Sequence, residues 1–394
     1  MKFSNKLTEE ERECVEVATR FARERLAPNY LESENAGIID RGLLKEMGKL
    51  GLIGSDLPVE HGGAGLSSFV TGALIETIGY ADINVAYVPL LASLLGDVLV
   101  RHATPDVAKH WLPKTISGEA ILALGLTEPR GGSDAANLTT TARAHGNGFR
   151  INGEKTSISM ATQADAVVLF ARTGAFEDGA RGVSGFLVPL DSPGISRTAF
   201  NDVGARSAGR GSIFFDDVFV PADHLLGDEG RGFVQVMQGF DYSRALIGLQ
   251  CVGAAQASLD ETWAYVQERE AFGAPIGRYQ GVTFPLAEAE TIIEATRQLC
   301  LHTLKLRDNG MPHTREAAMC KWMGPKVAHD AIHQCLLTFG HYGYSMETAH
   351  QQRMRDVMGF EIGDGTAQIM KLIIARTKIG NIAAQHQPLN GHRS

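Results

Sequence analysis

The sequence has few cysteines and no pattern that would join them. Among its 394 residues are 5 cysteines, and no two of them have the CxxC spacing of a metal or redox site. They lie far apart along the chain, which excludes a disulfide scaffold. We therefore predict free, buried thiols at Cys14, Cys251, Cys300, Cys320 and Cys335.

Long apolar segments and an excess of basic residues are also missing. No apolar segment approaches the ~20 residues of a membrane span, and the richest one, Val85–Val100, is interrupted by Pro89. The chain has 37 basic and 45 acidic residues, a net charge of −8. Nucleic-acid binding and adhesion to anionic membranes both need a basic face, so neither class of protein fits. The N-terminal segment MKFSNKLTEEERE is charged where a signal peptide is apolar, and we expect a cytoplasmic protein.

Glycine, in contrast, is abundant. The chain has 44 glycines in 394 residues, which is above the average share of about 7%. Apolar residues make up 44% and charged residues 21%, as in an ordinary soluble globular protein. The length is sufficient for two or three domains with many tight loops or close approaches of backbone to a ligand.

The spacing of apolar residues changes twice along the chain. Residues 1–119 and 233–394 have helical spacing, whereas residues 120–232 consist of short apolar runs bounded by Gly, Asn, Asp and Pro. We therefore predict an α+β protein with an N-terminal all-helical domain, a middle antiparallel sheet or barrel, and a C-terminal helical domain with these limits.

Local signals place the individual elements. Thr8 and Glu11 form a capping box before an apolar helix face that runs to Leu26, and Pro28 can end that helix. The segment 145–148 predicts a hairpin. Further helices are predicted over 42–50, 67–80, 85–102, 105–116, 233–269, 283–309, 313–339, 348–358 and 366–384. Strands are predicted over 120–126, 138–145, 149–151, 166–172, 183–190 and 212–220.

Two loops and one histidine pair carry polar groups that suggest a site. The loop 127–134 offers glycine amides and hydroxyls to a phosphate or heterocycle, or it merely links two strands. There is no GxGxxG motif, so a parallel dinucleotide-binding domain is not expected. Asp364, between two helices, is a turn residue or cap, or else a catalytic base. His329 and His333 have the i, i+4 spacing of metal ligands, but no third ligand stands out and no metal is predicted.

Six ordered segments resemble the acyl-CoA dehydrogenase family, and together they span nearly the whole chain. They are DLPVEHGGAGLS (56–67), LGLTEPRGGSD (124–134), NGEKTSIS (152–159), REAFGAPIGRYQ (269–280), FGHYGY (339–344) and RMRDVMGFEIGDGTAQIMKLIIAR (353–376). The resemblance implies an N-terminal helical domain, a middle antiparallel β-barrel and a C-terminal four-helix bundle, assembled as a homotetramer. It also implies non-covalent FAD.

The resemblance implies the residues that bind the cofactor and the substrate. The flavin ring would be lined by Leu124, Leu126, Thr127, Gly132, Ser133, Ser157, Ile158 and Ser159. The FAD of a partner subunit would be contacted by Arg269, Phe272, Gln280, Leu337, Gly340, His341, Thr366 and Gln368. Ser133, Asp241 and Arg244 would bind the acyl-CoA, and an electron-transfer flavoprotein or another acceptor would receive the electrons.

The implied reaction is α,β-dehydrogenation of an acyl-CoA thioester, with Asp364 as the catalytic base. A base removes the Cα proton while hydride passes from Cβ to the flavin, which carries the redox chemistry. The family's usual base is Glu, and its other location for that base is Ser243 here. Because Asp is shorter by one methylene, about 1.5 Å, we hypothesise an α-branched or alicyclic acyl group.

Other departures and functions remain open at this point. Ser157 stands where most relatives have Trp, which makes the usual electron acceptor less certain. Asp97 is either a solvated residue at a helix end or a second acid that acts on another carbon of an alicyclic substrate ring. The alternatives to dehydrogenation are a flavin oxidase of the same fold, similar to nitroalkane oxidases, and a non-catalytic family member that acts as an interaction partner.

Overall fold

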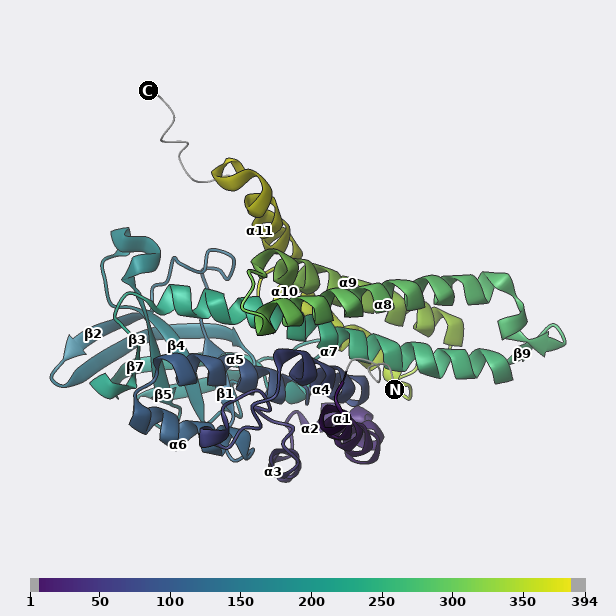
Figure 1. Ribbon diagram of the computed structural model, residues 1–394, viewed down its shortest axis with the longest axis horizontal. Coiled ribbons are helices and arrows are strands. Elements are labelled where there is room, and N and C mark those ends of the chain that lie inside the picture. The colour runs from purple at the N-terminus through teal and green to yellow at the C-terminus, as the bar shows by residue number, and fades with distance from the viewer. Residues whose placement is uncertain (1–6, 384–394) are drawn as a thin grey trace.

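The computed structural model describes residues 7–383 and divides into the predicted helical, sheet and helical parts. In Figure 1 the sheet lies at one end of the long axis, and the long C-terminal helices extend from it to the other end. The described residues do not include the first residues of the charged N-terminal segment. They also do not include Ala384, the last residue of the last predicted helix.

Among the described residues, six α-helices precede the sheet. They are α1 (Glu9–Phe21), α2 (Tyr30–Ala36), α3 (Arg41–Lys49), α4 (Ser68–Ala81), α5 (Tyr87–His102) and α6 (Pro105–Ile116). The predicted capping box is confirmed: the Thr8 hydroxyl accepts from the Glu11 N–H, and the Thr8 N–H donates to the Glu11 carboxylate. Pro28 does not stop the helical path, because it lies in the first turn of a short 3-10 helix, where its missing N–H is not needed.

The middle part is an eight-stranded sheet. Its strands are β1 (Leu122–Gly125), β2 (Thr141–His145), β3 (Gly148–Ile158), β4 (Ala166–Arg172), β5 (Val183–Pro189), β6 (Ile195–Ala199), β7 (Gly211–Pro221) and β8 (Leu225–Leu226). The order is β6-β7-β3-β2-β4-β5-β8, with β1 beside β4. The predicted hairpin joins β2 to β3, and Gly146 has the positive φ of 59° that its tight turn requires.

Most strand pairs are antiparallel, as predicted, but two are not. β1 pairs with β4 in parallel, with Leu122 opposite Ala166, and β2 meets β4 in parallel at Thr141 and Arg172. A parallel pair needs a long connection, which here is the loop 126–140 and the β2–β3 hairpin. Sequence patterns did not indicate β6 and β8, since β6 is an exposed edge strand and β8 has only 2 residues.

The C-terminal part is built on the 37-residue helix α7 (Gly232–Glu268). A small hairpin of β9 (Glu270–Ala271) and β10 (Ala274–Pro275) follows at its far end. The remaining helices are α8 (Gln280–Asp308), α9 (Thr314–Phe339), α10 (Ala349–Ile362) and α11 (Ala367–Ile379). Helices α7, α8 and α9 pack on one another, α10 packs on α7 and α9, and α11 packs on α9.

Two glycines let α7 and α9 approach each other closely. A Cβ atom on Gly324 of α9 would lie 2.7 Å from the Cα atom of Gly248 on α7, closer than real Cβ contacts. Pro325, next to Gly324, and Lys321, one turn earlier on α9, are both buried. The buried Lys321 side chain lies against the turn between α10 and α11, because it donates to the carbonyls of Phe360 and Gly365.

The cysteines are free thiols, as predicted, but the prediction that all five are buried is wrong for Cys14. Cys14 is half-buried, and Cys251, Cys300, Cys320 and Cys335 are buried. Within residues 7–383, no helix is both long and apolar enough to cross a membrane.

Candidate active site

The turn between α10 and α11 presents Asp364 in a special backbone conformation. Asp364 has a φ of 54° and Gly365 a φ of 98°, so both residues are left-handed. The Thr366 hydroxyl accepts from the Ile369 N–H and caps α11. The sequence allowed Asp364 to be either a helix cap or a catalytic base. The cap of α11 is Thr366, so the Asp364 carboxylate is not used as a cap.

Asp364 is half-buried, and its surroundings act on its charge in opposite directions. Burial raises the pKa of its carboxyl group, whereas the positive charges of Lys321 and Arg244 lower it. Lys321 is buried, and its ammonium group donates to the carbonyls of Phe360 (2.5 Å) and Gly365 (3.2 Å) on either side of Asp364. A carboxylate whose pKa is raised in this way is a stronger base than one in water.

A largely apolar cavity of about 330 Å³ lies beside Arg244. The Arg244 guanidinium donates through Nη1 to Asp241 (3.1 Å), while its buried Nε has no partner among the described residues. Burial lowers the pKa of Arg244 more than Asp241 raises it. The cavity is lined by Phe233, Val234, Met237, Gln238, Asp241, Arg244, Thr314 and Ile373. Such a site suits an amphiphilic ligand with an acceptor for the free N–H.

A buried ion pair anchors the loop 127–134, which is predicted to contact the flavin and is called the flavin loop here. Lys155 of β3 lies 2.7 Å from the Glu128 carboxylate and donates to the Leu126 carbonyl. Glu128 also accepts from the main-chain N–H groups of Thr139 (2.7 Å) and Thr140 (2.9 Å). Lys155 and these donors hold the pKa of Glu128 down at about 2, although burial opposes them. The two charges thus tie the loop to β3 and to the segment before β2.

Sequence reasoning missed both partners of this pair, although one signal was present. Lys155 lies in phase with Ile151 along β3, so it points inward with that apolar residue. A lysine at an inward position of a strand needs a buried carboxylate. The partner, Glu128, stands 27 residues away, and only the fold brings it there.

The residues predicted to line the flavin ring form one group. The Thr156 N–H donates to the Thr127 carbonyl (2.9 Å), which joins the loop after β1 to the end of β3. Leu124 and Thr127 are half-buried, and Leu126 and Ile158 are buried. Gly132, Ser133 and Ser157 are exposed and Ser159 is half-buried, so the group presents an accessible face with polar atoms.

The residues predicted to contact a partner's FAD lie in two places. Arg269 and Gln280 flank the β9–β10 hairpin, and Phe272 lies in its turn. Tyr265, close before the hairpin, stacks on Phe339 at the end of α9 (4.1 Å between ring centroids). This brings Leu337, Gly340 and His341 to the same end of the molecule. Thr366 and Gln368 are instead at the start of α11, beside Asp364, and α10 separates them from that end.

The hairpin and the flavin loop of one chain cannot share one cofactor. Figure 1 shows β9 and the main sheet at opposite ends of the molecule, and α7 between them spans about 55 Å at 1.5 Å per residue. Phe272 at the hairpin is 98% exposed and Leu337 is 56% exposed. Both are therefore free to meet another chain.

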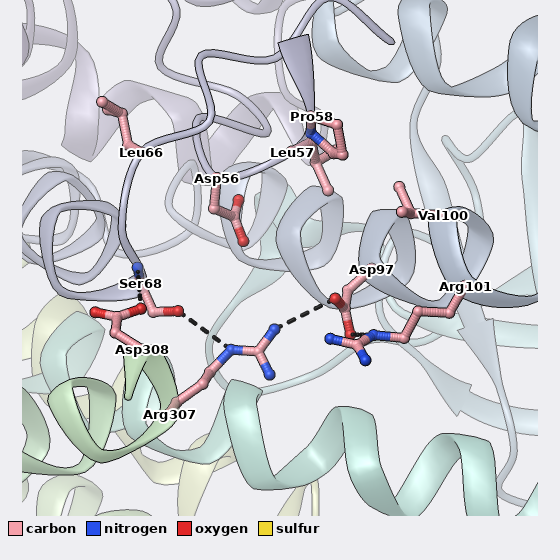
Figure 2. A pocket seen from close by; sticks show the side chains of 10 residues that line it. All are labelled: Asp56, Leu57, Pro58, Leu66, Ser68, Asp97, Val100, Arg101, Arg307 and Asp308. Atoms are coloured by element: carbon pink, nitrogen blue, oxygen red, sulfur yellow. Dashed lines mark hydrogen bonds and ion pairs between the residues drawn. The ribbon is translucent and has the colours of Figure 1, made fainter. Parts of the chain in front are cut away.

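Asp97 lies apart from Asp364, in a charged cavity of about 290 Å³. Its two carboxylate oxygens accept from Arg101 (2.9 Å) and from Arg307 (3.3 Å). Figure 2 shows Arg307 between Ser68 and Asp97, with Asp56 above it. Asp97 thus joins α5 to α8, and this ion-pair cluster favours a structural role over that of a second acid.

Comparison with known proteins gives one family for all three parts. The acyl-CoA dehydrogenase N-terminal, middle and C-terminal domain models match residues 8–119, 123–218 and 230–379. A probable acyl-CoA dehydrogenase of Bacillus subtilis is 36% identical over 94% of this chain and 98% of its own length. The human mitochondrial short-chain specific acyl-CoA dehydrogenase is 34% identical over 94% of this chain and 90% of its own.

Solved structures agree with the sequences. The butyryl-CoA dehydrogenase of Megasphaera elsdenii superposes with a TM-score of 0.91 at 28% identity, over 95% of this chain and 99% of that one. The order of the domains, the positions of the loops and these relatives lead to one conclusion. The chain belongs to the acyl-CoA dehydrogenase family, oxidoreductases that act on CH–CH groups.

Proposed function

We propose that this chain carries out FAD-dependent α,β-dehydrogenation of an acyl-CoA thioester, with Asp364 as the base that removes the Cα proton. The observation that carries the proposal is an Asp364 carboxylate that does not cap a helix, has a raised pKa and lies in a left-handed turn near Arg244. The turn places Asp364 between α10 and α11, where Thr366 supplies the helix cap and the Asp364 carboxylate is not used for it. Partial burial strengthens it as a base, and Lys321 and Arg244 keep it charged.

The residues around the flavin loop fit FAD. The loop is anchored on its inner side by Glu128 and Lys155, so its backbone is preorganised while Gly132 and Ser133 stay exposed to a ligand. A Cβ atom on Gly131 would meet no atom within 4 Å, which leaves room above the loop. When bound, FAD would accept the hydride from Cβ, and Thr127, Ser133 and Ser157 would orient it.

We also propose that the β9–β10 hairpin and the end of α9 reach the FAD of a second copy in a homotetramer. Several apolar side chains at this end are exposed in the single chain. They are Phe272 (98%), Tyr344 (86%), Met346 (68%), Leu337 (56%) and Tyr342 (50%). Exposed apolar patches of this kind mark surfaces that another chain covers.

The acyl group that we propose is α-branched or alicyclic. The support is the shorter reach of Asp364, which lacks one methylene relative to Glu. A substituent on Cα fills the space that the shorter side chain leaves and presses the Cα–H toward the carboxylate. Arg244 and Asp241 would bind the CoA part, with the free Nε of Arg244 as a donor.

The test is anaerobic titration of the flavin absorbance with straight-chain, branched and alicyclic acyl-CoA thioesters. We expect the branched or alicyclic class to reduce the flavin with a higher kcat/KM than butyryl-CoA. A preference for straight chains would refute the proposed acyl group and leave the dehydrogenase reaction in place. Oxygen consumption with nitroalkanes, without bleaching by any thioester, would instead indicate an oxidase.

A further inference from the structure

We infer that Lys321 is a positioning residue for Asp364: it holds the turn that carries the carboxylate, and its buried positive charge keeps that carboxylate ionised. The inference rests on the proposed role of Asp364 as the base. It adds a residue of α9 that lies 43 positions earlier in the chain and that no sequence motif connected with the reaction.

The hydrogen bonds of Lys321 enclose the catalytic turn. Its ammonium group donates to the Phe360 carbonyl, in the last turn of α10, and to the Gly365 carbonyl, directly after Asp364. The Phe360 ring is itself fixed by stacking on Tyr87 of α5, with 4.8 Å between ring centroids. The main chain is therefore held on both sides of the residue that needs a left-handed conformation.

Within residues 7–383, no carboxylate is in direct contact with the Lys321 ammonium group. Both of its hydrogen bonds within the described part of the chain go to main-chain carbonyls. An ammonium group that is 1% exposed is costly without such a partner, and burial lowers the pKa of Lys321 to about 8. A neutral donor would satisfy two carbonyls at less cost, so the charge itself has a function. Among its neighbours, Asp364 does most to keep Lys321 protonated.

The other groups around Asp364 do not replace Lys321. Arg244 of α7 also lowers the pKa of Asp364, but its guanidinium is already paired with Asp241. Tyr87 of α5 faces the carboxylate as a neutral phenol, since burial raises its pKa. Cys251 of α7 and Glu361 of α10 also act on Lys321, and both favour its protonated form. Among the described residues, Lys321 thus has no ion-pair partner, whereas Arg244 is paired with Asp241.

The experiment follows the protonation of Asp364 directly. The carboxylic acid C=O stretch of the FAD-bound protein is recorded by infrared difference spectroscopy across a pH series, and D364N identifies the band. We expect K321M and K321Q to move the midpoint of this titration upward by about 1 to 3 on the pH scale, because a neighbouring opposite charge is lost. K326Q is the matched control, because Lys326 lies on the same helix but is exposed and paired with Asp330.

The glutamine variant separates the charge from the hydrogen bonds. K321Q keeps an N–H donor for the carbonyls but has no charge, so a purely structural role predicts a wild-type midpoint in K321Q. That result, in a folded variant that retains flavin, would overturn the inference. At pH values below the midpoint, flavin reduction by acyl-CoA should slow about tenfold each time the midpoint rises by one pH unit. The infrared midpoint tests Lys321 even if no thioester reduces the flavin, so failure of the proposed function is recognised separately.

A reciprocal measurement covers the case in which neither neutral variant folds. Two interacting charges shift each other equally, so removal of the Asp364 charge must lower the pKa of Lys321. The ammonium titration is followed by NMR through ¹³C-labelled lysine in wild type and D364N, and K321R identifies the signal. A lower midpoint in D364N supports the inference, and an unchanged midpoint refutes it.

Discussion

Replacement of Asp364 by Asn is expected to stop reduction of the bound flavin by acyl-CoA while the flavin stays in place. A positioned general base contributes about 10² to 10⁴-fold to a rate, and the nearby Ser243 is buried and cannot replace a carboxylate. The turn keeps its shape, because Thr366 caps α11 and Lys321 binds the adjacent carbonyls. Stopped-flow absorbance with substrate in excess measures the reduction rate, and the spectrum of the purified variant measures flavin content.

Two further variants sharpen this result. D97N is the matched control, and we expect near wild-type flavin reduction because Asp97 is held by Arg101 and Arg307 in a separate cavity. D364E restores about 1.5 Å of reach and is expected to move the preference toward straight-chain thioesters. A D364N protein that still reduced its flavin at a wild-type rate would remove Asp364 from the mechanism.

Replacement of Lys155 by Met is expected to destabilise the protein by about 3–5 kcal/mol, the usual effect of removing one partner of a buried ion pair. Glu128 would remain buried at 3% exposure without its countercharge. Because Glu128 and Lys155 anchor the flavin loop, the variant should also bind FAD more weakly. Urea denaturation of the apoprotein measures the stability, and a fluorescence titration with FAD measures the affinity.

The same ion pair predicts a pH dependence. Glu128 has a pKa of about 2 in the folded protein against 4.5 for the free side chain. Its stabilising contribution is thus complete above about pH 4.5 and is lost as the pH falls toward 2. The double variant E128Q/K155M, which has no lone charge, should regain part of the stability. Equal stabilities of K155M and the double variant would show that the buried charge of Glu128 is not the cause.

Much of the fold could be predicted because its signals are local. The capping box of Thr8 and Glu11, the Gly146 hairpin and the two changes in apolar spacing depend on residues that are close in sequence. Secondary structure is decided over such short windows. The parallel pairing of β1 with β4 could not be predicted in this way, since it joins strands more than 40 positions apart and no local pattern distinguishes the two directions.

The candidate site shows the same division. By itself the sequence determined the three-part order of helices, sheet and helices, the family, and the placement of Asp364 between two helices. Only the tertiary structure decided which charges meet: Lys155 with Glu128, Arg307 with Asp97 and Lys321 with the turn at Asp364. The reason is physical. Apolar periodicity is repeated along every element, whereas a buried charge is a single residue whose partner is fixed only when distant elements pack together.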